Sequence, residues 1–219
     1  LRVIEGGVTA PAGFRAAGLH CGIKASGKPD LSLIVSDTPA TAAGLFTLNL
    51  AKAAPVYLSQ DHLASSGGRA TAIITNSGCA NACTGPQGVA DASEMARLTA
   101  SALGCRENLV LVASTGVIGV NLKMDKIRAG VPQAVSALAA DGGAAAARAI
   151  IEPRMATMLG YLTTDADVDQ VMLGRALTEA CTYTFNAITV DGEPSTNDCV
   201  FALASGTSGV TINENLYAA

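Results

Sequence analysis

Thr157 is the residue whose surroundings best fit nucleophilic chemistry. It stands in the phrase Pro-Arg-Met-Ala-Thr-Met-Leu at 153–159, between small and apolar residues and at the entrance to a predicted strand. A threonine becomes a good nucleophile at the start of a chain, because its own α-amino group, with a pKa of about 7.7–8.0, can accept the hydroxyl proton. Cleavage after Ala156 would create that amine, and the same hydroxyl could first attack the Ala156 carbonyl. Taken alone, the phrase is that of a core threonine.

A glycine turn offers a second kind of chemistry. The phrase Ser-Thr-Gly-Val-Ile-Gly at 114–119 follows a predicted strand, and its glycines allow close approach of backbone to a ligand. Such a turn can donate N–H groups to a developing oxyanion. A tight strand-to-helix turn explains the phrase equally and is the simpler interpretation of the residues alone. The glycines match neither a dinucleotide fingerprint nor a phosphate-binding loop, so no nucleotide cofactor is predicted.

Two further polar phrases also follow predicted strands. Asn-Ser-Gly-Cys-Ala-Asn-Ala-Cys-Thr-Gly occupies 76–85 and Asp-Gly-Glu-Pro-Ser-Thr-Asn-Asp occupies 191–198. The second could bind a metal, but its spacing is not that of an EF-hand, and turn chemistry explains both. Cys79 and Cys83 lack a second pair of ligands, so buried thiols are favoured over zinc. The two histidines of the chain lie near no nucleophile-elbow pattern, and we expect both at loop or surface positions.

Composition excludes several classes of function. With 49% hydrophobic and 15% charged residues, the 219-residue chain can bury one sizeable core or two small ones. The net charge is −4 and no Lys/Arg cluster stands out, so no nucleic-acid partner is expected. No apolar run has the length of a membrane span or signal peptide, and the six cysteines suggest reduced thiols, so a cytoplasmic protein without membrane contact is expected.

The candidate phrases sit between alternating strands and helices. Short apolar runs predict strands at 31–35, 70–75, 108–114, 158–163, 187–190 and 200–205. Helical spacing predicts helices at 91–103, 124–138 and 168–185, with Pro132 marking a break or a start, and the Ala-rich stretch 141–149 favours a helix or a linker. The alternation predicts mixed α and β layers.

Taken together, the four phrases resemble the ornithine acetyltransferase family, also called bifunctional glutamate N-acetyltransferases, and occur in that family's order. The opening phrases at 7–14 and 22–24 resemble it too, so the likeness runs from about Val8 to Phe201. The resemblance implies a layered α/β sandwich and two-step acetyl transfer in arginine biosynthesis: a freed threonine takes acetyl from N2-acetylornithine and passes it to glutamate. Some members also accept acetyl-CoA, and no cofactor is implied.

Carried over by motif, the resemblance assigns roles to individual residues. Thr157 would be the nucleophile and a substrate contact, the Ala156–Thr157 bond would be self-cleaved, and Thr115 and Gly116 would form the oxyanion hole. Cleavage would divide the chain into an α-like part, 1–156, and the start of a β-like part, 157–219. The two parts would stay associated, and such pairs would dimerise into a heterotetramer.

The chain departs from the family in two places. Between the helix at 141–150 and the nucleophile strand, the family has a segment with Thr-Thr-Asp and Lys-Gly-x-Gly-Met, whereas here Ile150 runs directly into Ile-Glu-Pro. Thr-Thr-Asp at 163–165 matches a different family phrase. Family chains also continue beyond Ala219 into a region with substrate-binding Glu, Asn and Ser/Thr residues. If the chain is complete, we expect uncovered apolar strand faces and no useful rate of acetyl transfer.

Two alternatives stay open at this level. An inactive remnant of the family could at best bind a partner, because lineage does not guarantee activity when half of the substrate contacts are missing. A related self-processing N-terminal-nucleophile peptidase would need only the threonine and the oxyanion turn. The presence of all four phrases favours the acetyltransferase lineage over the peptidase.

Overall fold

The computed structural model describes residues 4–151, 157–188 and 194–214, so Ala156 lies outside the described residues. The strands are β1 (Phe14–Leu19), β2 (Leu31–Phe46), β3 (Arg69–Cys79), β4 (Val110–Val117), β5 (Leu159–Thr164) and β6 (Cys199–Ala204). The helices are α1 (Ala54–Ser65), α2 (Gly85–Leu103), α3 (Met124–Ser136), α4 (Gly143–Ile150) and α5 (Gln170–Tyr183), with short 3-10 turns at Gly7–Thr9, Glu107–Leu109 and Phe185–Ala187.

Strand β2 carries the chain from one half of the sheet to the other. Its first part pairs antiparallel with β1 and β3, its register shifts between Val35 and Ala40, and its second part pairs antiparallel with β6. Strand β4 runs parallel to β3, and β5 runs parallel to β6. A bulge bends a strand and increases its twist, so one long strand can serve both halves. The sheet order among the described strands is β4-β3-β2-β6-β5, with β1 beside β2.

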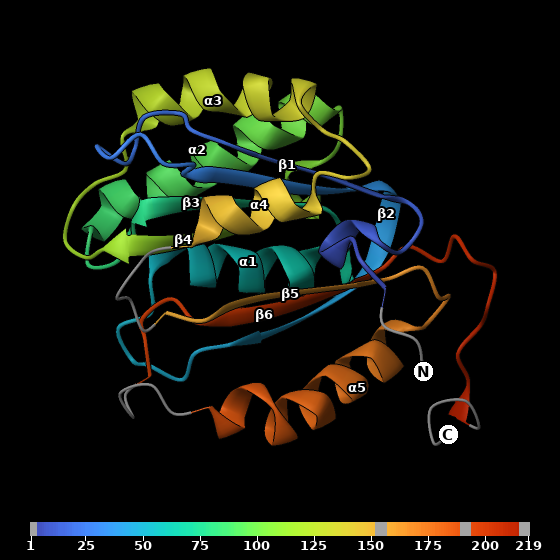
Figure 1. The fold of residues 1–219 in the computed structure, drawn as a ribbon. Coiled ribbons are helices and arrows are strands. Elements are labelled where there is room, and N and C mark those ends of the chain that lie inside the picture. The colour runs from blue at the N-terminus through green and yellow to red at the C-terminus, as the bar shows by residue number, and fades with distance from the viewer. Residues whose placement is uncertain (1–3, 152–156, 189–193, 215–219) are drawn as a thin grey trace.

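The two halves of the sheet face each other across an apolar core. Ile73 and Leu111 from the first half pack in one cluster with Phe201 and Leu203 from β6. The Tyr161 ring stacks on Phe201 at 5.9 Å between centroids, and its hydroxyl lies 2.8 Å from Thr75 Oγ1 on β3. Helices α2 and α3 cover the outer face of the first half and α5 covers the outer face of the second (Figure 1). The predicted layered α/β sandwich is therefore confirmed.

Side chains of α1 cover the free edge of β4. Ser59 Oγ donates to the carbonyl of Val112 at 2.7 Å and accepts from its N–H at 2.8 Å. His62 Nδ1 lies 2.7 Å from the carbonyl of Val110, and because a carbonyl only accepts, this nitrogen carries the proton. The prediction that both histidines lie at loops or on the surface is wrong for His62, which is buried in α1 because it satisfies this edge.

Asp30 organises the turn between β1 and β2. Its buried carboxylate accepts from the backbone N–H groups of Cys21, Gly22 and Lys24 at 2.6, 3.2 and 2.9 Å. Burial raises the pKa of Asp30, but the hydrogen bonds from Cys21 and Lys24 outweigh it and leave that pKa below its ordinary value. Lys24 Nζ in turn donates to the carbonyl of Ile151 at 2.7 Å, which fixes the end of α4 against this turn.

Most of the predicted elements are confirmed with shifted ends. The helix predicted at 141–149 is α4, and the five strand predictions other than 187–190 correspond to β2 to β6. The strand predicted at 187–190 is wrong where it is described, because Ala187 ends a 3-10 turn and Ile188 has no regular structure, while 189–190 lie outside the described residues. Among the described helices, none is both long and apolar enough to cross a bilayer.

Candidate active site

Thr157 lies two residues before β5, at the end of the sheet that is on the left in Figure 1. It is half-buried, and its Oγ1 is 2.9 Å from the Oγ of Ser195. Ser195 belongs to the loop that leads into β6, and β5 and β6 start side by side because Leu159 pairs with Cys199. The parallel pairing therefore brings the predicted nucleophile against the polar phrase that ends at residue 198.

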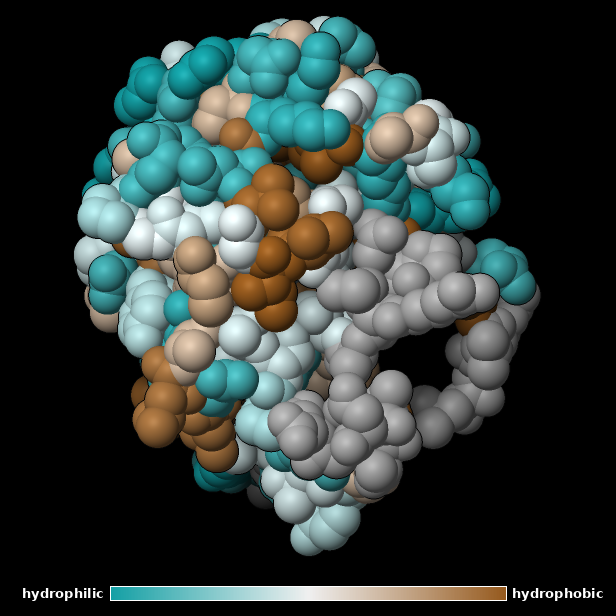
Figure 2. Space-filling view, turned by 90° about the vertical axis from the view of Figure 1, so that its left-hand side faces the viewer, coloured by the Kyte–Doolittle hydropathy of each residue, from teal (hydrophilic) through white to brown (hydrophobic). Residues whose placement is uncertain are grey.

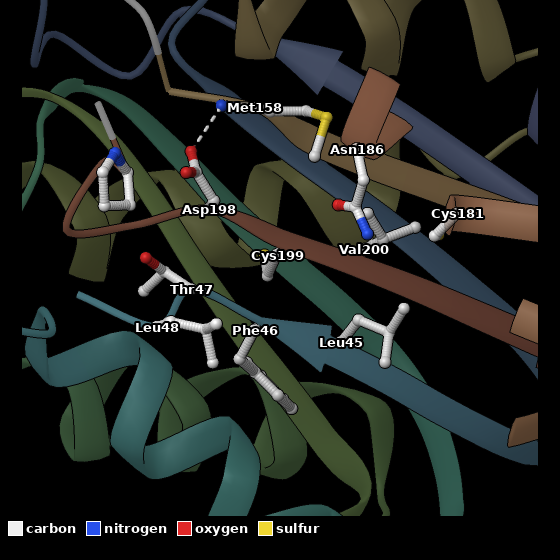
Figure 3. Close-up of a pocket in the computed structure, with 11 residues that line it drawn as sticks. Leu45, Phe46, Thr47, Leu48, Met158, Cys181, Asn186, Asp198, Cys199 and Val200 are labelled. Atoms are coloured by element: carbon white, nitrogen blue, oxygen red, sulfur yellow. Dashed lines mark hydrogen bonds between the residues drawn. The ribbon is translucent and has the colours of Figure 1, made fainter. Parts of the chain in front are cut away.

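Asp198 holds both sides of this contact. One carboxylate oxygen accepts from the N–H of Met158 at 2.8 Å (Figure 3). The other accepts from the N–H of Ser195 at 3.0 Å. The residue after Thr157 and the residue that contacts its hydroxyl are thus fixed by a single carboxylate. Hydrogen bonds to an ionised acceptor are short and strong, so this arrangement restricts the position of the Thr157 side chain.

The Ser195 loop is also attached to the segment that follows β2. Thr47 Oγ1 donates to the carbonyl of Ser195 at 2.5 Å, and Asn49 Nδ2 donates to the carbonyl of Pro194 at 2.8 Å. The N–H of Ala53, just before α1, donates to the carbonyl of Thr196 at 2.9 Å. Three carbonyls of one short loop are therefore satisfied by neighbouring chain, which gives the loop a defined path.

Asn197 joins this loop to the end of β4. Its buried side-chain amide donates to the carbonyls of Ala80 and Ser114 at 2.7 and 2.8 Å, while its backbone N–H donates to Ser195 Oγ at 3.2 Å. The Ser114 carbonyl continues the free edge of β4 that α1 covers further back. Through Asn197 and Ser195, the structure connects Thr157 with the residue that immediately precedes Thr115.

Thr115 and Gly116 are buried near the end of β4, where the pairing with β3 becomes irregular. Gly116 has φ 129 and Gly78, opposite it, has φ 100, values that side chains rarely adopt. A Cβ at Gly116 would also collide with the backbone of Gly78 and Cys79. The glycine turn predicted from the sequence is thus present, and its glycine is required by a close approach of two strands.

The phrase at 76–85 builds the support for this turn. The side chain of Asn76 accepts from Ser114 Oγ at 2.6 Å and donates to the Cys79 carbonyl at 2.8 Å, and all three residues are buried. Asn81 has φ 49, in the left-handed region that asparagine tolerates, and its amide donates to the carbonyl of Gly88 at 2.8 Å. The turn prediction is confirmed only for residues 80–84, because residues 76–79 belong to β3. Of the two thiols of the phrase, Cys79 is buried as predicted, whereas Cys83 is exposed.

A cavity of about 310 Å³ opens beside Met158 and Asp198 (Figure 3). Its walls are mainly apolar and come from the end of β2, the start of β6 and the end of α5: Leu45, Phe46, Thr47, Leu48, Met158, Cys181, Asn186, Pro194, Asp198, Cys199 and Val200. The size and the few polar groups are typical of a small-molecule site. Figure 2 shows apolar side chains gathered at this end of the molecule, and Leu48, which lines the cavity, is one of the exposed large hydrophobics.

Other groups near the site are poor nucleophiles. Burial raises the pKa of the Cys199 thiol, with a smaller contribution from Asp198, and burial raises the pKa of Cys181. Burial also raises the pKa of Tyr161 well above its ordinary value. These groups stay protonated near neutral pH. Within the described ranges, no group of three or more His, Cys, Asp or Glu side chains is placed to hold a metal ion.

The sequence predicts Thr157, Thr115 and Gly116 as site residues but does not predict Ser195, Asn197 or Asp198. The phrase at 191–198 predicts a turn; where the structure describes it, at 194–198, it forms a loop whose side chains contact the predicted nucleophile, the residue after it and β4. The available signal was the concentration of hydroxyl, amide and carboxylate groups directly before a buried strand. Nothing in local spacing says which partner such groups will face.

Known proteins are similar to this chain over most of its length. Two relatives named arginine biosynthesis bifunctional protein ArgJ, from Symbiobacterium thermophilum and a Synechococcus species, are 49% and 47% identical to it, each over 94% of this chain. The alignments cover 59% and 57% of those relatives, so the chain spans less than two thirds of their length. The first alignment has 240 positions, more than the 219 residues of this chain, so it includes stretches of the relative that have no counterpart here.

Two solved structures are also similar. A chain of ornithine acetyltransferase from Mycobacterium tuberculosis, complexed with ornithine, gives a TM-score of 0.66 at 46% identity, over 69% of this chain and 82% of that one. The arginine biosynthesis bifunctional protein argJ from Bacillus halodurans gives a TM-score of 0.65 at 30% identity, over 98% of this chain and 94% of that one.

The sequence profile of the ArgJ family matches residues 15–151 and 142–218. The two matches overlap where the sequence analysis expects a family segment to be missing, and together they include Thr115, Gly116, Thr157 and the Ser195 loop. With this match and with relatives close to half identical, the chain belongs to the ArgJ family.

Proposed function

We propose that this protein transfers the acetyl group of N2-acetylornithine to glutamate in arginine biosynthesis, through an acetyl ester on the hydroxyl of Thr157. The names of the relatives and the ornithine in the M. tuberculosis complex support this substrate class. The observation that carries the proposal is the contact of Thr157 Oγ1 with a loop that is itself bonded to the end of β4, beside Thr115.

Maturation would use the same hydroxyl. Thr157 Oγ1 attacks the carbonyl carbon of Ala156, the peptide C–N bond breaks, and the acyl group moves to oxygen while the nitrogen becomes a free α-amine. Water then hydrolyses the ester, which releases the carboxyl group of Ala156 and regenerates the hydroxyl. The new amine serves as the base that a threonine nucleophile needs.

In the transfer reaction, the α-amine accepts the Thr157 proton as Oγ1 attacks the acetyl carbonyl of N2-acetylornithine. Thr115 and Gly116 would stabilise the resulting oxyanion, as preorganised donors do in acyl transfer. Collapse releases ornithine, whose amine takes up the proton, and leaves acetyl-Thr157. The amine of glutamate then attacks the ester, and N-acetylglutamate departs from the regenerated hydroxyl.

The parts 1–156 and 157–219 would stay together after cleavage. Strand β6 from the second part pairs with β2 from the first over six residue pairs, from Thr41–Ala204 to Phe46–Cys199. The M. tuberculosis structure supports such a division. The alignment covers 82% of that chain but only 69% of this one, so that chain is the shorter of the two. The curated relatives are much longer than this chain, so a short chain in a solved structure is consistent with one part of a divided protein. We further propose that pairs of such parts dimerise.

The test is release of ornithine from N2-acetylornithine with glutamate present, together with mass spectrometry of the Thr157 peptide when glutamate is withheld. We expect ornithine release and an acetyl group on Thr157. Thr157→Ala should abolish both, whereas Thr163→Ala, in the strand that follows Thr157, should abolish neither. Acetyl-CoA replaces N2-acetylornithine in a parallel assay. Release by Thr157→Ala at the parental rate, or acetylation elsewhere, would contradict the proposal.

A further inference from the structure

We propose that Ser195 is a further catalytic residue, whose hydroxyl donates a hydrogen bond to Thr157 Oγ1 and stabilises the negative charge that this oxygen carries when its bond to the acyl carbon forms or breaks. The inference rests on the proposed function and deepens it. Its basis is the 2.9 Å contact between the two hydroxyl oxygens, supported by the hydrogen bonds that hold Ser195 in place.

Either hydroxyl could donate across this contact, and the proposal takes Ser195 as the donor. The backbone N–H of Asn197 donates to Ser195 Oγ at 3.2 Å, which uses one of its acceptor sites and polarises its O–H bond. Ser195 keeps its proton free to donate, and in the proposal that proton points to Thr157 Oγ1, 2.9 Å away. The Thr157 hydroxyl keeps its own proton available for the α-amine. In the proposal, the Asn197 N–H and the Ser195 O–H thus form a chain of two hydrogen bonds that ends at the nucleophile.

Ser195 is held as a preorganised donor must be. Its N–H is bound by Asp198 at 3.0 Å and its carbonyl accepts from Thr47 at 2.5 Å, so both backbone groups of the residue are fixed. Asp198 also binds the N–H of Met158, which sets the two partners relative to each other. Donors that need no reorganisation during the reaction give the largest electrostatic stabilisation.

The chemistry predicts which state of the enzyme Ser195 favours. The oxygen of a hydroxyl or alkoxide accepts a stronger hydrogen bond than the alkyl oxygen of an ester. Ser195 therefore stabilises Thr157 with its oxygen free, and the transition states that lead to and from it, more than it stabilises acetyl-Thr157. Its removal should slow both half-reactions and raise the fraction of enzyme that carries acetyl during turnover.

The experiment compares Ser195→Ala, Ser195→Thr and the parent, with Ser208→Ala as a matched control in another loop, where the hydroxyl donates to the carbonyl of Asp165. Three quantities are measured: the rate of self-cleavage, the rate of ornithine release, and the steady-state fraction of acetyl-Thr157 by mass spectrometry after acid quench. Thermal midpoints are recorded for each variant. A hydrogen bond to a charged oxygen corresponds to about 10–100-fold in rate.

We expect Ser195→Ala to lose about 10–100-fold in both rates and to accumulate acetyl-Thr157, with Ser195→Thr close to the parent. An active parent with Ser195→Ala indistinguishable from Ser208→Ala would overturn the inference alone. Equal loss in Ser195→Thr and Ser195→Ala at parental thermal midpoints would overturn it too, since the hydroxyl would not matter. If Ser195→Ala does not fold, Ser195→Cys, a weaker donor of similar shape, replaces it. A parent without either reaction refutes the proposed function and the inference together.

Discussion

Asn197→Asp should be among the most destabilising single substitutions that preserve side-chain shape in this protein. The change replaces an amide that donates two hydrogen bonds with a carboxylate that donates none. The two bonds, at 2.7 and 2.8 Å to the carbonyls of Ala80 and Ser114, lie in a residue that is 2% exposed. Leaving a buried acceptor without its donor costs about 1–3 kcal/mol, so two of them give about 2–6 kcal/mol.

The same substitution should depend on pH with a defined sign. A buried carboxylate that faces two carbonyl oxygens has its pKa raised above the unfolded value near 3.9. The loss of stability is therefore largest above the raised folded-state pKa. It shrinks as the pH falls from there towards about 4 and is smallest below about 4, where the group is protonated in both states and can donate one bond. Asn197→Asp should thus recover part of its deficit in acid.

The assay is urea unfolding followed by circular dichroism, because the sequence has no tryptophan. Asn121→Asp is the control, since it makes the same chemical change at an exposed position. The reasoning would be refuted by a free energy of unfolding for Asn197→Asp within about 0.5 kcal/mol of that for Asn121→Asp, the range of ordinary surface substitutions. The rate of self-cleavage should fall as well, because Asn197 positions the loop that contacts the nucleophile.

Three further predictions concern the turn at the end of β4, its proposed role and the β1–β2 turn. Gly116→Ala should cost more stability than Gly119→Ala in the same unfolding assay: both positions have positive φ, about 1–2 kcal/mol of strain, but only at Gly116 would the new methyl group meet the backbone of Gly78. Thr115→Ala should lower kcat for acetyl transfer by about 10²–10³-fold if this residue supplies an oxyanion donor, and a parental kcat would reject that role. Asp30→Asn should be less stable than the parent at neutral pH, and the difference should vanish as the pH falls below about 4 through the lowered pKa of Asp30; a difference that stays constant from pH 7 to pH 3 would contradict this.

The local pattern of apolar residues was sufficient to predict the strands and helices in which that pattern is continuous. Strands β3 and β4 are buried on both faces, so each forms a continuous apolar run in the sequence. Helix α2 is buried along one face, so its apolar residues recur at helical spacing. The sequence pattern did not predict β1, whose central residues Ala16, Ala17 and Gly18 are small, and it did not predict α1. Helix α1 has Pro55 in its first turn and buries Ser59 and His62. These polar residues are buried because their side chains make hydrogen bonds to the backbone at the edge of β4.

The residues of the candidate site also differ in whether the sequence predicts them. Thr157 and the glycine turn could be named as candidates because their phrases, together with two others, resemble those of a known family; taken alone, they fit a core threonine and a tight turn. The positions of Ser195, Asn197 and Asp198 depend on β5 pairing with β6 and on the fold of the sheet across β2, which brings the start of β6 to the end of β4. That neighbourhood is a property of the whole topology, and no window of sequence contains it.

The most direct test of the account is the intact mass of the purified protein and of its Thr157→Ala and Thr157→Ser variants. If Thr157 is the nucleophile, the parent should separate under denaturing conditions into two fragments, one of which begins with Thr157. Under native conditions these fragments should run together, since β6 pairs with β2. Thr157→Ala should remain one chain, and Thr157→Ser should be cleaved at the same bond. A parent that remains a single chain, or a Thr157→Ala protein that divides at the same bond, would contradict the central claim.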